Sequence, residues 1–500
     1  MSGGARMSGG ARGSGGGQRR TGGGQRRTGG GGGGRISPAR LVAYEVLQDV
    51  EERDSYANLA LPGRIRDAGL DARDAGLATE LAAGALRWRG RYDRIIELAA
   101  GREIERIDAR TRTVLRLGAH QLLGMRTAAH AAVNESVELQ RRVGNRAAAG
   151  FVNGVLRSIG RASNDEWDAR IADAATSAND ARAALASHPT WIIRALQDAL
   201  RAEGREAELD ALLAADNDAP RVSLAILPGA GVTVAEAAMA AAESGATATG
   251  PSPLGVEIGA GDPARAIAVS GARPGYARVQ DQGSQLAALA LTRVRPVRRG
   301  ERWLDLCAGP GGKTAVLGAE ALAAGARVRA NEVSEHRAEL VRRSVSGVAD
   351  AVEVVSYDGR GDEAYGGQTF DRILVDAPCS GLGALRRRPE ARWRKQPSDL
   401  PELTRLQAEL LRQATAHLAP GGVLAYVTCS PHLAETRVTL DRLLRDHPEL
   451  REIDARAVVG EVARSEIDLA GASLSVQLWP HRHGTDAMFI ALVERRATGA

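Results

Sequence analysis

Lysine, cysteine and aromatic residues are scarce in this chain of 500 residues, and each shortage excludes something. Aromatic residues make up 3% of the sequence, so alanine and the aliphatic residues, within a hydrophobic content of 44%, must build the cores. The three cysteines are too few and odd in number for a disulfide framework, which favours reduced thiols. Lys313 and Lys395 are the only lysines. The length predicts about two to four domains.

Signals for membrane insertion and secretion are also lacking. No apolar run approaches the roughly 20 residues that would span a bilayer, and no apolar segment typical of a secretory signal stands near the N-terminus. We therefore expect a cytoplasmic protein.

The net charge of +5 belongs to one end of the chain. Seven of the 66 basic side chains lie in residues 1–35, which contain no acidic residue. The remainder of the chain therefore has 59 basic and 61 acidic side chains. This Gly/Arg-rich stretch has nothing to bury and is predicted to be a disordered tail. It is either an arm that attracts nucleic acid or a tolerated extension.

Helical periodicity dominates residues 36–161. Leu115, Ala119 and Leu122 recur at helical spacing, and several such segments with short connections predict an all-α domain. The runs LRLGAHQLLGM, AAVNESVEL and FVNGVLRSI resemble the NusB fold. The resemblance implies contact with RNA or a ribosomal protein; a helical domain that only packs against the rest is the alternative. Residues 162–270 are interpreted as a polar linker and a small middle domain, with one plausible strand at 222–227.

Strands and helices alternate in residues 271–500. Candidate strands are 302–306, 327–332, 352–356, 371–376 and 422–428, with helices at 313–324, 334–345, 402–418 and 433–446. This alternation predicts a parallel sheet with helices on both faces, and ligands of such sheets bind outside the carboxyl ends of the strands. Notable side chains at or just beyond those ends should share one cleft: Asp305, Glu332, Asp358, Asp376, Cys379 and Cys429.

The run LDLCAGPGGKT, residues 304–314, predicts a strand, a glycine-rich loop and a helix N-terminus. Such a loop admits a ligand close to the backbone, and the helix end offers it free N–H groups. Gly312, Lys313 and Thr314 match the end of a phosphate-binding P-loop, but Cys307 stands where its first glycine is needed. An NTPase is therefore one open interpretation of the loop, which leaves two cysteines at strand ends unexplained.

Acids follow the neighbouring strands. Glu332 is placed to accept hydrogen bonds from ribose hydroxyls, and Asp358 can accept one from an adenine amino group. Together with Asp305 they suit an adenosine ligand with a cationic tail, whereas they would repel a triphosphate. This pattern favours S-adenosylmethionine over ATP as the cofactor.

Cys379 and Cys429 each follow a predicted strand, outside the apolar runs in which a free cysteine is normally buried. A thiolate adds well to C6 of cytosine, which makes C5 nucleophilic toward a sulfonium methyl group. Loss of the C5 proton and β-elimination then restore the ring and free the thiol. A second cysteine can assist that release.

These motifs together resemble the RNA (cytosine-5)-methyltransferases of the NOL1/NOP2/Sun family. Segments typical of the family occur in its order: VQDQGSQLAAL, LDLCAGPGGKT, a strand-end acid, YDG, VDAPCSGLGALRRRPE and YVTCSPHLAE. The resemblance implies a Rossmann-like, S-adenosylmethionine-dependent methyltransferase domain behind the NusB-like one.

The resemblance also implies roles for individual residues. Cys429 is the expected nucleophile, Cys379 aids product release, and Asp376 orients the target base. DNA cytosine methyltransferases instead use a Pro-Cys cysteine like Cys379 as nucleophile, so the two assignments compete. The implied cofactor site consists of Cys307, Ala308, Gly309, Pro310, Gly311, Gly312, Lys313, Glu332, Asp358 and Asp376.

A NusB-like region ahead of such a catalytic domain implies a cytidine in 16S ribosomal RNA as the target, in naked RNA or in an assembling small subunit. The base must be unstacked to reach a thiol, so single-stranded or loop RNA is expected. A basic cluster after Cys379 is interpreted as a loop that contacts phosphates, with a solvated basic loop as the alternative. It comprises Arg386, Arg387, Arg388, Arg392, Trp393, Arg394 and Lys395.

We expect a monomer that uses no metal and has no membrane partner. His481 and His483 form an H-x-H pair without other nearby ligands and are interpreted as surface residues. The main alternative function is an RNA-binding or antitermination factor with an inactive catalytic domain. The intact cysteine pair and glycine loop argue against it.

Overall fold

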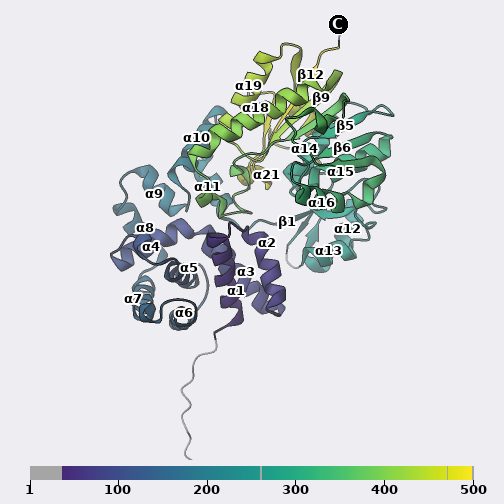
Figure 1. Cartoon of the computed structure of the whole chain (residues 1–500). Helices are drawn as coiled ribbons and strands as arrows, with labels where there is room; N and C mark the ends of the chain where they lie inside the picture. The colour runs from purple at the N-terminus through teal and green to yellow at the C-terminus, as the bar shows by residue number, and fades with distance from the viewer. Residues whose placement is uncertain (1–35, 260–261, 470, 498–500) are drawn as a thin grey trace, which may run out of the picture. The chain divides into compact units, whose positions relative to one another are not determined.

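A computed structural model describes residues 36–259, 262–469 and 471–497; the predicted disordered tail, residues 1–35, lies outside the described residues. The first part of the described chain is helical (Figure 1). Asp71 and Asp108 cap two of its helices by accepting hydrogen bonds from backbone N–H groups three residues on. The helices are α1 (Pro38–Glu52), α2 (Ala57–Asp67), α3 (Ala72–Arg87), α4 (Arg89–Ala100), α5 (Ala109–Leu123), α6 (Ala129–Val143) and α7 (Ala149–Ile159).

The predicted all-α domain is confirmed, and α5 lies at its centre. Val114, Leu115 and Ala119 of α5 are fully buried in one apolar cluster with residues of α1, α3, α4 and α7. None of the helices among the described residues is both long and apolar enough to cross a membrane.

Four further helices occupy residues 164–217, although the first part of this interval was expected to be a polar linker. Ser163 and Ser177 cap the first two, which carry few large apolar residues and therefore show a weak helical pattern in the sequence. Both pack against α4. The helices are α8 (Asn164–Asp173), α9 (Ala178–Leu185), α10 (Thr190–Ala202) and α11 (Leu209–Asn217).

A small antiparallel sheet follows, with strand order β2-β3-β1-β4. The predicted strand at 222–227 is confirmed as its β1 (Val222–Ile226), whereas the other three strands were not predicted. They are β2 (Ala246–Thr247), β3 (Gly255–Ile258) and β4 (Ala277–Val279), accompanied by the helices α12 (Val234–Ala240) and α13 (Pro263–Val269).

The large sheet has the order β10-β12-β9-β8-β5-β6-β7, with β11 paired to β12. The five predicted strands are confirmed and run parallel: β5 (Arg302–Asp305), β6 (Arg327–Asn331), β7 (Val352–Val355), β8 (Phe370–Asp376) and β9 (Leu418–Thr428). The expectation of an entirely parallel sheet is wrong, because β12 (Phe489–Arg495) runs antiparallel to β9 and β10 (Leu450–Ile453) antiparallel to β12. The short β11 (Val476–Gln477) is antiparallel too.

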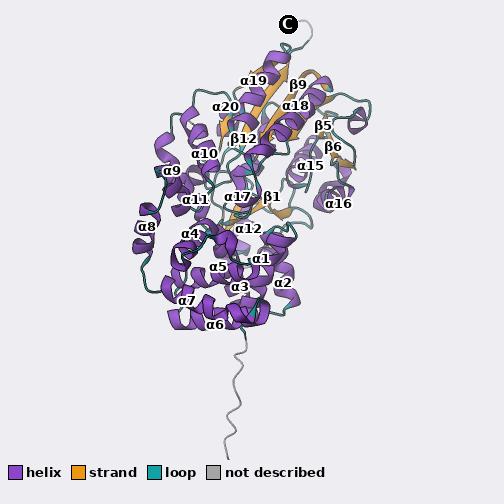
Figure 2. Cartoon of the chain, turned by 60° about the vertical axis from the view of Figure 1, so that its left-hand side comes forward, coloured by secondary structure: helices purple, strands orange, loops and turns teal. Residues whose placement is uncertain are grey.

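Helices cover both faces of the large sheet, as the alternation predicted. Successive residues of a strand point to opposite faces, so Leu374 joins the core under α14, α15 and α16, while Ile373 and Val375 join the core under α18 and α19. Figure 2 shows α18 and α19 beside β9. The helices are α14 (Gln282–Arg293), α15 (Gly312–Ala324), α16 (Glu335–Ser344), α17 (Ala391–Arg394), α18 (Leu400–Ala416), α19 (Arg437–Asp446), α20 (Ala455–Val462) and α21 (Pro480–His483).

Candidate active site

The glycine loop, residues 307–314, connects the central strand β5 to α15. Gly311 has a φ of 98°, and a Cβ there would lie 2.5 Å from the Cβ of Ser344, so only glycine fits this turn. The Ala308 N–H donates to the Asn331 carbonyl, which ties the loop to the end of β6. Strands β8 and β6 lie on opposite sides of β5, so the strand order of the sheet reverses at β5. The loop stands at this point, where ligands of such sheets usually bind.

A cavity of about 480 Å³ opens beside this loop. Seven of the sequence-predicted site residues line it together: Cys307, Gly309, Glu332, Asp358, Asp376, Cys379 and Cys429. Five predicted cofactor residues are not among its lining: Ala308, Pro310, Gly311, Gly312 and Lys313.

The two acids after β6 and β7 are each held by an arginine. Glu332 accepts from the N–H of Gly309 at 3.0 Å and pairs with Arg337 at 3.4 Å. Asp358 pairs with Arg360 at 2.6 Å, and this hydrogen-bonded guanidinium lowers the pKa of the carboxyl. Both carboxylates face a cavity next to backbone N–H groups, a donor and acceptor set that fits the ribose and adenine of S-adenosylmethionine.

Lys313 reaches Asp376 rather than the loop. Its Nζ donates to Asp376 Oδ2 at 2.7 Å. Burial disfavours the charged amine, but the Asp376 carboxylate outweighs this and raises the pKa of Lys313. A P-loop lysine must reach phosphate, so this pairing does not support the NTPase interpretation.

Asp305 was expected in the cleft but lies beneath the loop. It is 1% exposed and accepts from the Thr314 hydroxyl at 2.8 Å. Burial raises its pKa to about 7. Since β5 is the central strand, the loop that follows it covers its last side chain.

The two thiols meet between the ends of β8 and β9. Cys379 Sγ lies 3.4 Å from Cys429 Sγ. The hydrogen bond between them raises the pKa of Cys379 and lowers that of Cys429, to which the charges of Lys313 and Arg388 also contribute. The directions of the two shifts favour Cys379 as the donor and Cys429 as the acceptor of this hydrogen bond. Burial raises the pKa of the third cysteine, Cys307, so that thiol stays protonated.

Glu435 joins the two cysteine loops, a role that the sequence did not predict. It is fully buried and accepts from the N–H of Ser380 at 2.7 Å and from the hydroxyl of Ser430 at 2.7 Å. Ser380 and Ser430 directly follow the two cysteines. An acid within YVTCSPHLAE is the only signal that could have pointed to it.

The arginine loop, residues 386–395, is not the free basic surface that the sequence indicated. Arg386 donates to the Gly484 carbonyl at 2.6 Å, and Arg387 donates to Asp281 and Asp486, both at 2.8 Å. These contacts occupy the guanidinium groups within the catalytic region itself. The prediction of a phosphate-contacting role is therefore wrong for these two arginines.

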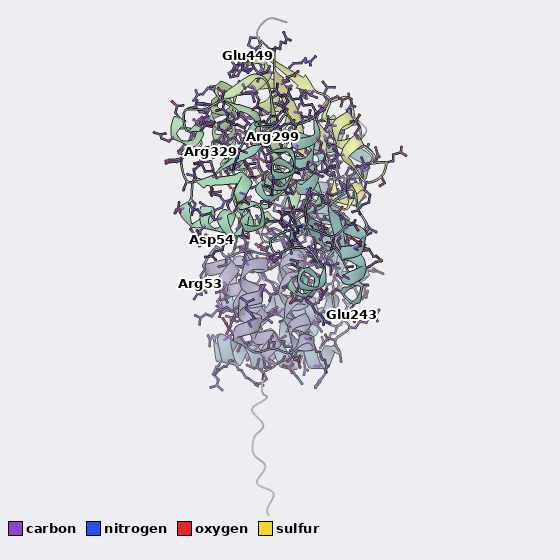
Figure 3. All side chains as sticks on the ribbon, turned by 90° about the vertical axis from the view of Figure 1, so that its right-hand side faces the viewer. Arg53, Asp54, Glu243, Arg299, Arg329 and Glu449 are labelled. Atoms are coloured by element: carbon purple, nitrogen blue, oxygen red, sulfur yellow. The ribbon has the colours of Figure 1, made fainter. Side chains whose placement is uncertain are left out.

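Two further arginines of this loop bind the N-terminal helices. Arg392 is fully buried and donates to the carbonyls of Arg87, Ser187 and Asp216 and to Asn217 Oδ1 at 2.7 to 3.1 Å. Arg394 donates to the carbonyls of Val50, Asp54 and Ser55 at the turn after α1, where Figure 3 labels Asp54. The phosphate-contacting role is wrong for these two as well, because Arg392 is fully buried among protein groups and Arg394 donates to three backbone carbonyls. Trp393 packs beside Gly90 and Arg89.

The histidines of the H-x-H pair, interpreted as surface residues, are partly buried and hydrogen-bonded to neighbouring groups. His481 Nε2 bonds Glu208 at 2.9 Å, and the His483 Nδ1 accepts from the Trp479 N–H at 2.8 Å. Within the described residues no group of three or more potential ligands could hold a metal ion.

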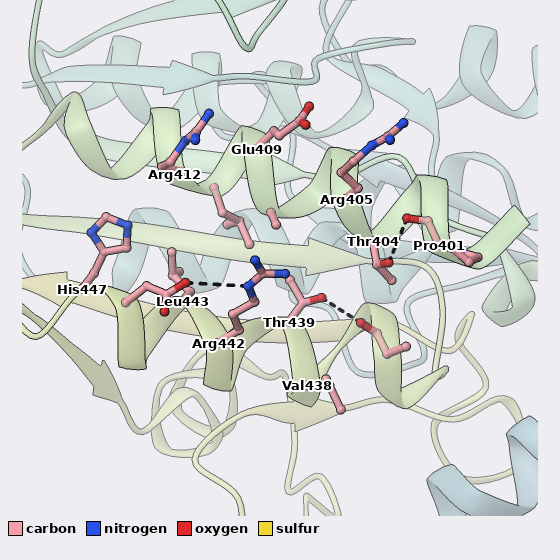
Figure 4. A pocket seen from close by; sticks show the side chains of 14 residues that line it. Pro401, Thr404, Arg405, Glu409, Arg412, Val438, Thr439, Arg442, Leu443 and His447 are labelled. Atoms are coloured by element: carbon pink, nitrogen blue, oxygen red, sulfur yellow. Dashed lines mark hydrogen bonds and ion pairs between the residues drawn. The ribbon is translucent and has the colours of Figure 1, made fainter.

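A second cavity, of about 780 Å³, lies between α18 and α19. Figure 4 shows Arg405, Glu409 and Arg412 of α18 on one side and Arg442 of α19 on the other. It holds no cysteine and none of the predicted site residues. Size therefore does not identify the active site; the convergence of thiols, acids and glycine loop does.

Comparisons with known proteins agree with this geometry. Residues 293–494 match the family model described as 16S rRNA methyltransferase RsmB/F, and residues 37–161 match that of the NusB family. The chain is 48% identical over 461 residues to "Putative methyltransferase Rv1407" of Mycobacterium tuberculosis, covering 92% of this chain and 97% of that protein. It is 32% identical over 423 residues to ribosomal RNA small subunit methyltransferase B of Pseudomonas putida, covering 84% of this chain and 92% of that protein.

A solved structure shares the fold. The crystal structure of PH0851 superposes with a TM-score of 0.74 at 22% identity, covering 92% of this chain and 99% of that one. The fold and site thus define a methyltransferase that uses S-adenosylmethionine and carries a NusB domain at its N-terminal side. Within that class, the chain belongs to the RsmB/F family of 16S rRNA methyltransferases, which confirms the family resemblance of its motifs.

Proposed function

We propose that this chain methylates C5 of a cytidine in 16S ribosomal RNA through a covalent bond between Cys429 Sγ and C6 of the base. The observation that supports this most is the pair of thiols 3.4 Å apart in the same cavity as Glu332 and Asp358. The relative named ribosomal RNA small subunit methyltransferase B favours 16S rRNA as the substrate.

S-adenosylmethionine supplies an electrophilic methyl group when it is bound. Cys307, Gly309, Glu332, Asp358 and Asp376 line the cavity and would hold it. Of the other predicted cofactor residues, Ala308, Pro310 and Gly311 hold the loop in shape, Gly312 begins α15, and Lys313 pairs with Asp376.

Cys429 acts first. Its thiolate adds to C6 of the cytosine, and the electron pair of the C5–C6 double bond shifts toward C4 and N3, which leaves an enamine with a nucleophilic C5. C5 would then take the methyl group as the methyl–sulfonium bond breaks, and the electrons of that bond would remain on sulfur in the departing thioether. A base then removes the C5 proton, and the electrons of that C–H bond re-form the double bond and expel Cys429 as a thiolate. Cys379 donates its hydrogen bond to this leaving thiolate and so speeds product release.

Asp376 and Lys313 orient the target base. The Asp376 carboxylate lines the cavity and can accept a hydrogen bond from the exocyclic amino group of cytosine. The Nζ of Lys313 lies 2.7 Å from Asp376 Oδ2 and holds this carboxylate in place.

A methyl-transfer assay tests the function. We expect label to pass from S-adenosylmethionine to unmethylated 16S rRNA, with bisulfite sequencing locating 5-methylcytidine at one position. Retained RNA binding without transfer would instead support the RNA-binding factor hypothesis. ATP turnover without cofactor binding would favour the NTPase.

The two cysteines should separate in an adduct assay. Cys379→Ala is expected to accumulate a covalent protein–RNA adduct that resists denaturing gels, because release slows while attack remains. Cys429→Ala should form no adduct and lose activity by on the order of 10⁴-fold or more. The reverse pattern would assign the nucleophile to Cys379.

The proposed division of labour places RNA binding in residues 36–161 and catalysis in residues 271–500, with residues 162–270 between them. Because ribosomal RNA is the proposed substrate, free or in an assembling subunit, we place the reaction in the cytoplasm. A monomer contains every residue that the scheme uses.

A further inference from the structure

The charges around the active-site cavity do not balance. Its three lining carboxylates each have a cation partner: Glu332 with Arg337, Asp358 with Arg360, and Asp376 with Lys313. Two further cations, Arg388 and Lys395, also line the cavity. Among the described residues, neither of their side chains has a hydrogen-bond or ion-pair partner. The cavity therefore carries two positive charges without a counter-ion.

Both cations belong to the arginine loop, whose other arginines are already engaged. Arg386, Arg387, Arg392 and Arg394 bind protein carboxylates and carbonyls. Arg388 and Lys395 are the only cations of this loop that line the cavity containing the two thiols. They share the lining of this cavity with Cys379 and Cys429, which a substrate base must reach.

A tyrosine of the N-terminal helices lines the same cavity. Tyr56, the residue before α2, places its ring 4.8 Å from the Arg388 guanidinium and 5.3 Å from that of Arg394. Arg394 in turn holds the turn before Tyr56 through the Ser55 carbonyl, and Glu390 accepts from the N–H of Ala57 at 3.1 Å. Cation–π contact with a ring fixed in this way holds Arg388 toward the cavity.

We propose that Arg388 and Lys395 bind the backbone phosphate of the target nucleotide, and that Tyr56 is the positioning residue that aims Arg388. The inference rests on the proposed function, since it names the binding partner of the same site. A flipped nucleotide brings its phosphate to the rim of the pocket that takes its base. The N-terminal helical region thereby becomes part of the catalytic site instead of only a separate RNA-binding module.

Two charge-removing variants test the phosphate site in the full chain. For Arg388→Gln with Lys395→Gln, we expect the Kd for a fluorescein-labelled, cytidine-containing single-stranded RNA to rise about tenfold. The slope of log K against log salt should fall by about 0.7 for each lost contact. The Kd for S-adenosylmethionine should stay within twofold. Arg445→Gln, an exposed arginine of α19, is the matched control and should leave both constants unchanged.

Two results would overturn the phosphate site. One is an unchanged Kd and salt slope for RNA in the double variant. The other is a raised Kd for S-adenosylmethionine with normal RNA binding, which would assign the two cations to the carboxylate of the cofactor. A wild-type chain that binds RNA with these salt effects but transfers no methyl group would defeat the proposed function and leave the phosphate site standing.

Tyr56 is tested by a pair of variants. Tyr56→Phe keeps the ring face and should behave as wild type, whereas Tyr56→Leu should raise KM for RNA severalfold with kcat little changed. Equal behaviour of the two variants, with unchanged thermal stability, would remove Tyr56 from the proposal. A loss of kcat alone in Tyr56→Leu would also contradict a role in aiming a phosphate ligand.

Discussion

The glycine loop and the arginine loop border the same cavity, but their hydrogen-bond partners lie at very different distances along the chain. Gly309 bonds Glu332, 23 residues away, at the end of the adjacent strand. Arg392 bonds three backbone carbonyls and the Asn217 side chain, all 175 to 305 residues away along the chain. The glycine loop therefore follows from the sheet alone, whereas the arginine loop has its shape only when the helical region is docked.

This difference affects how well the function of each loop can be predicted from its composition. A glycine-rich turn before a helix has few functions in proteins, and the residues around this one are consistent with cofactor binding. A basic loop can have many functions, and here four of its six cations bind protein groups, with Arg392 and Arg394 joining the catalytic region to the helical region. A positively charged sequence thus predicts nucleic-acid contact only for those cations whose protein partners are absent.

The largest effect on stability is expected from a substitution of Arg392, which links the arginine loop to the helical region. Arg392→Met leaves its four acceptors unpaired in a fully buried site, which should lower the free energy of unfolding by about 3–5 kcal/mol. Urea denaturation followed by circular dichroism measures this. Arg445→Met, on an exposed site, should cost less than about 0.5 kcal/mol. An equally small effect of both variants would contradict the docking role of the arginine loop.

A smaller, purely functional effect is expected in the glycine loop. A Cβ on Gly309 would lie 2.2 Å from Glu332 Oε2, so Gly309→Ala displaces that carboxylate and should raise the Kd for S-adenosylmethionine about tenfold. Gly312→Ala is the matched control, because its Cβ would meet nothing closer than Gln280 at 3.7 Å.

Isothermal titration calorimetry measures both constants. Gly309→Ala should leave RNA binding as in the wild type, because the loop does not reach the cations of the arginine loop. If Gly312→Ala weakened the cofactor as much as Gly309→Ala does, the loop would touch the cofactor along its whole length, as the sequence first suggested.

The smallest effect concerns the thiols that lie between the two loops. The hydrogen bond with Cys379 lowers the pKa of Cys429, which increases the thiolate fraction of Cys429 at neutral pH. Cys379→Ala removes the hydrogen-bond donor, so the pKa of Cys429 rises and its iodoacetamide alkylation at pH 7 should slow severalfold. The two rates should converge above about pH 9, where either form is ionised.

Mass spectrometry of the Cys429 peptide gives these rates. Cys307→Ala should not change them, since Cys307 does not contact the thiol pair. Equal rates in Cys379→Ala and wild type at pH 7 would show that Lys313 and Arg388, and not Cys379, lower the pKa of Cys429.

Much of the catalytic region could be predicted because its signals are local. Strands β5 to β9 are short apolar runs that end in polar residues, and the parallel sheet brings those ends together. The glycine loop, Glu332, Asp358 and the two cysteines consequently meet in one cavity. The helical region was predictable for the same reason, since the spacing of its apolar residues specifies helices directly.

Only the tertiary structure decided which partners the charged side chains have. Whether Lys313 faces phosphate or Asp376, and whether Arg392 faces RNA or the carbonyls of α11, depends on which distant segments pack nearby. The sequence determined the sheet, the glycine turn and the thiols, because hydrophobic periodicity and backbone constraints act over a few residues. Tyr56 entered the site through packing between segments more than 300 residues apart, which no local pattern encodes.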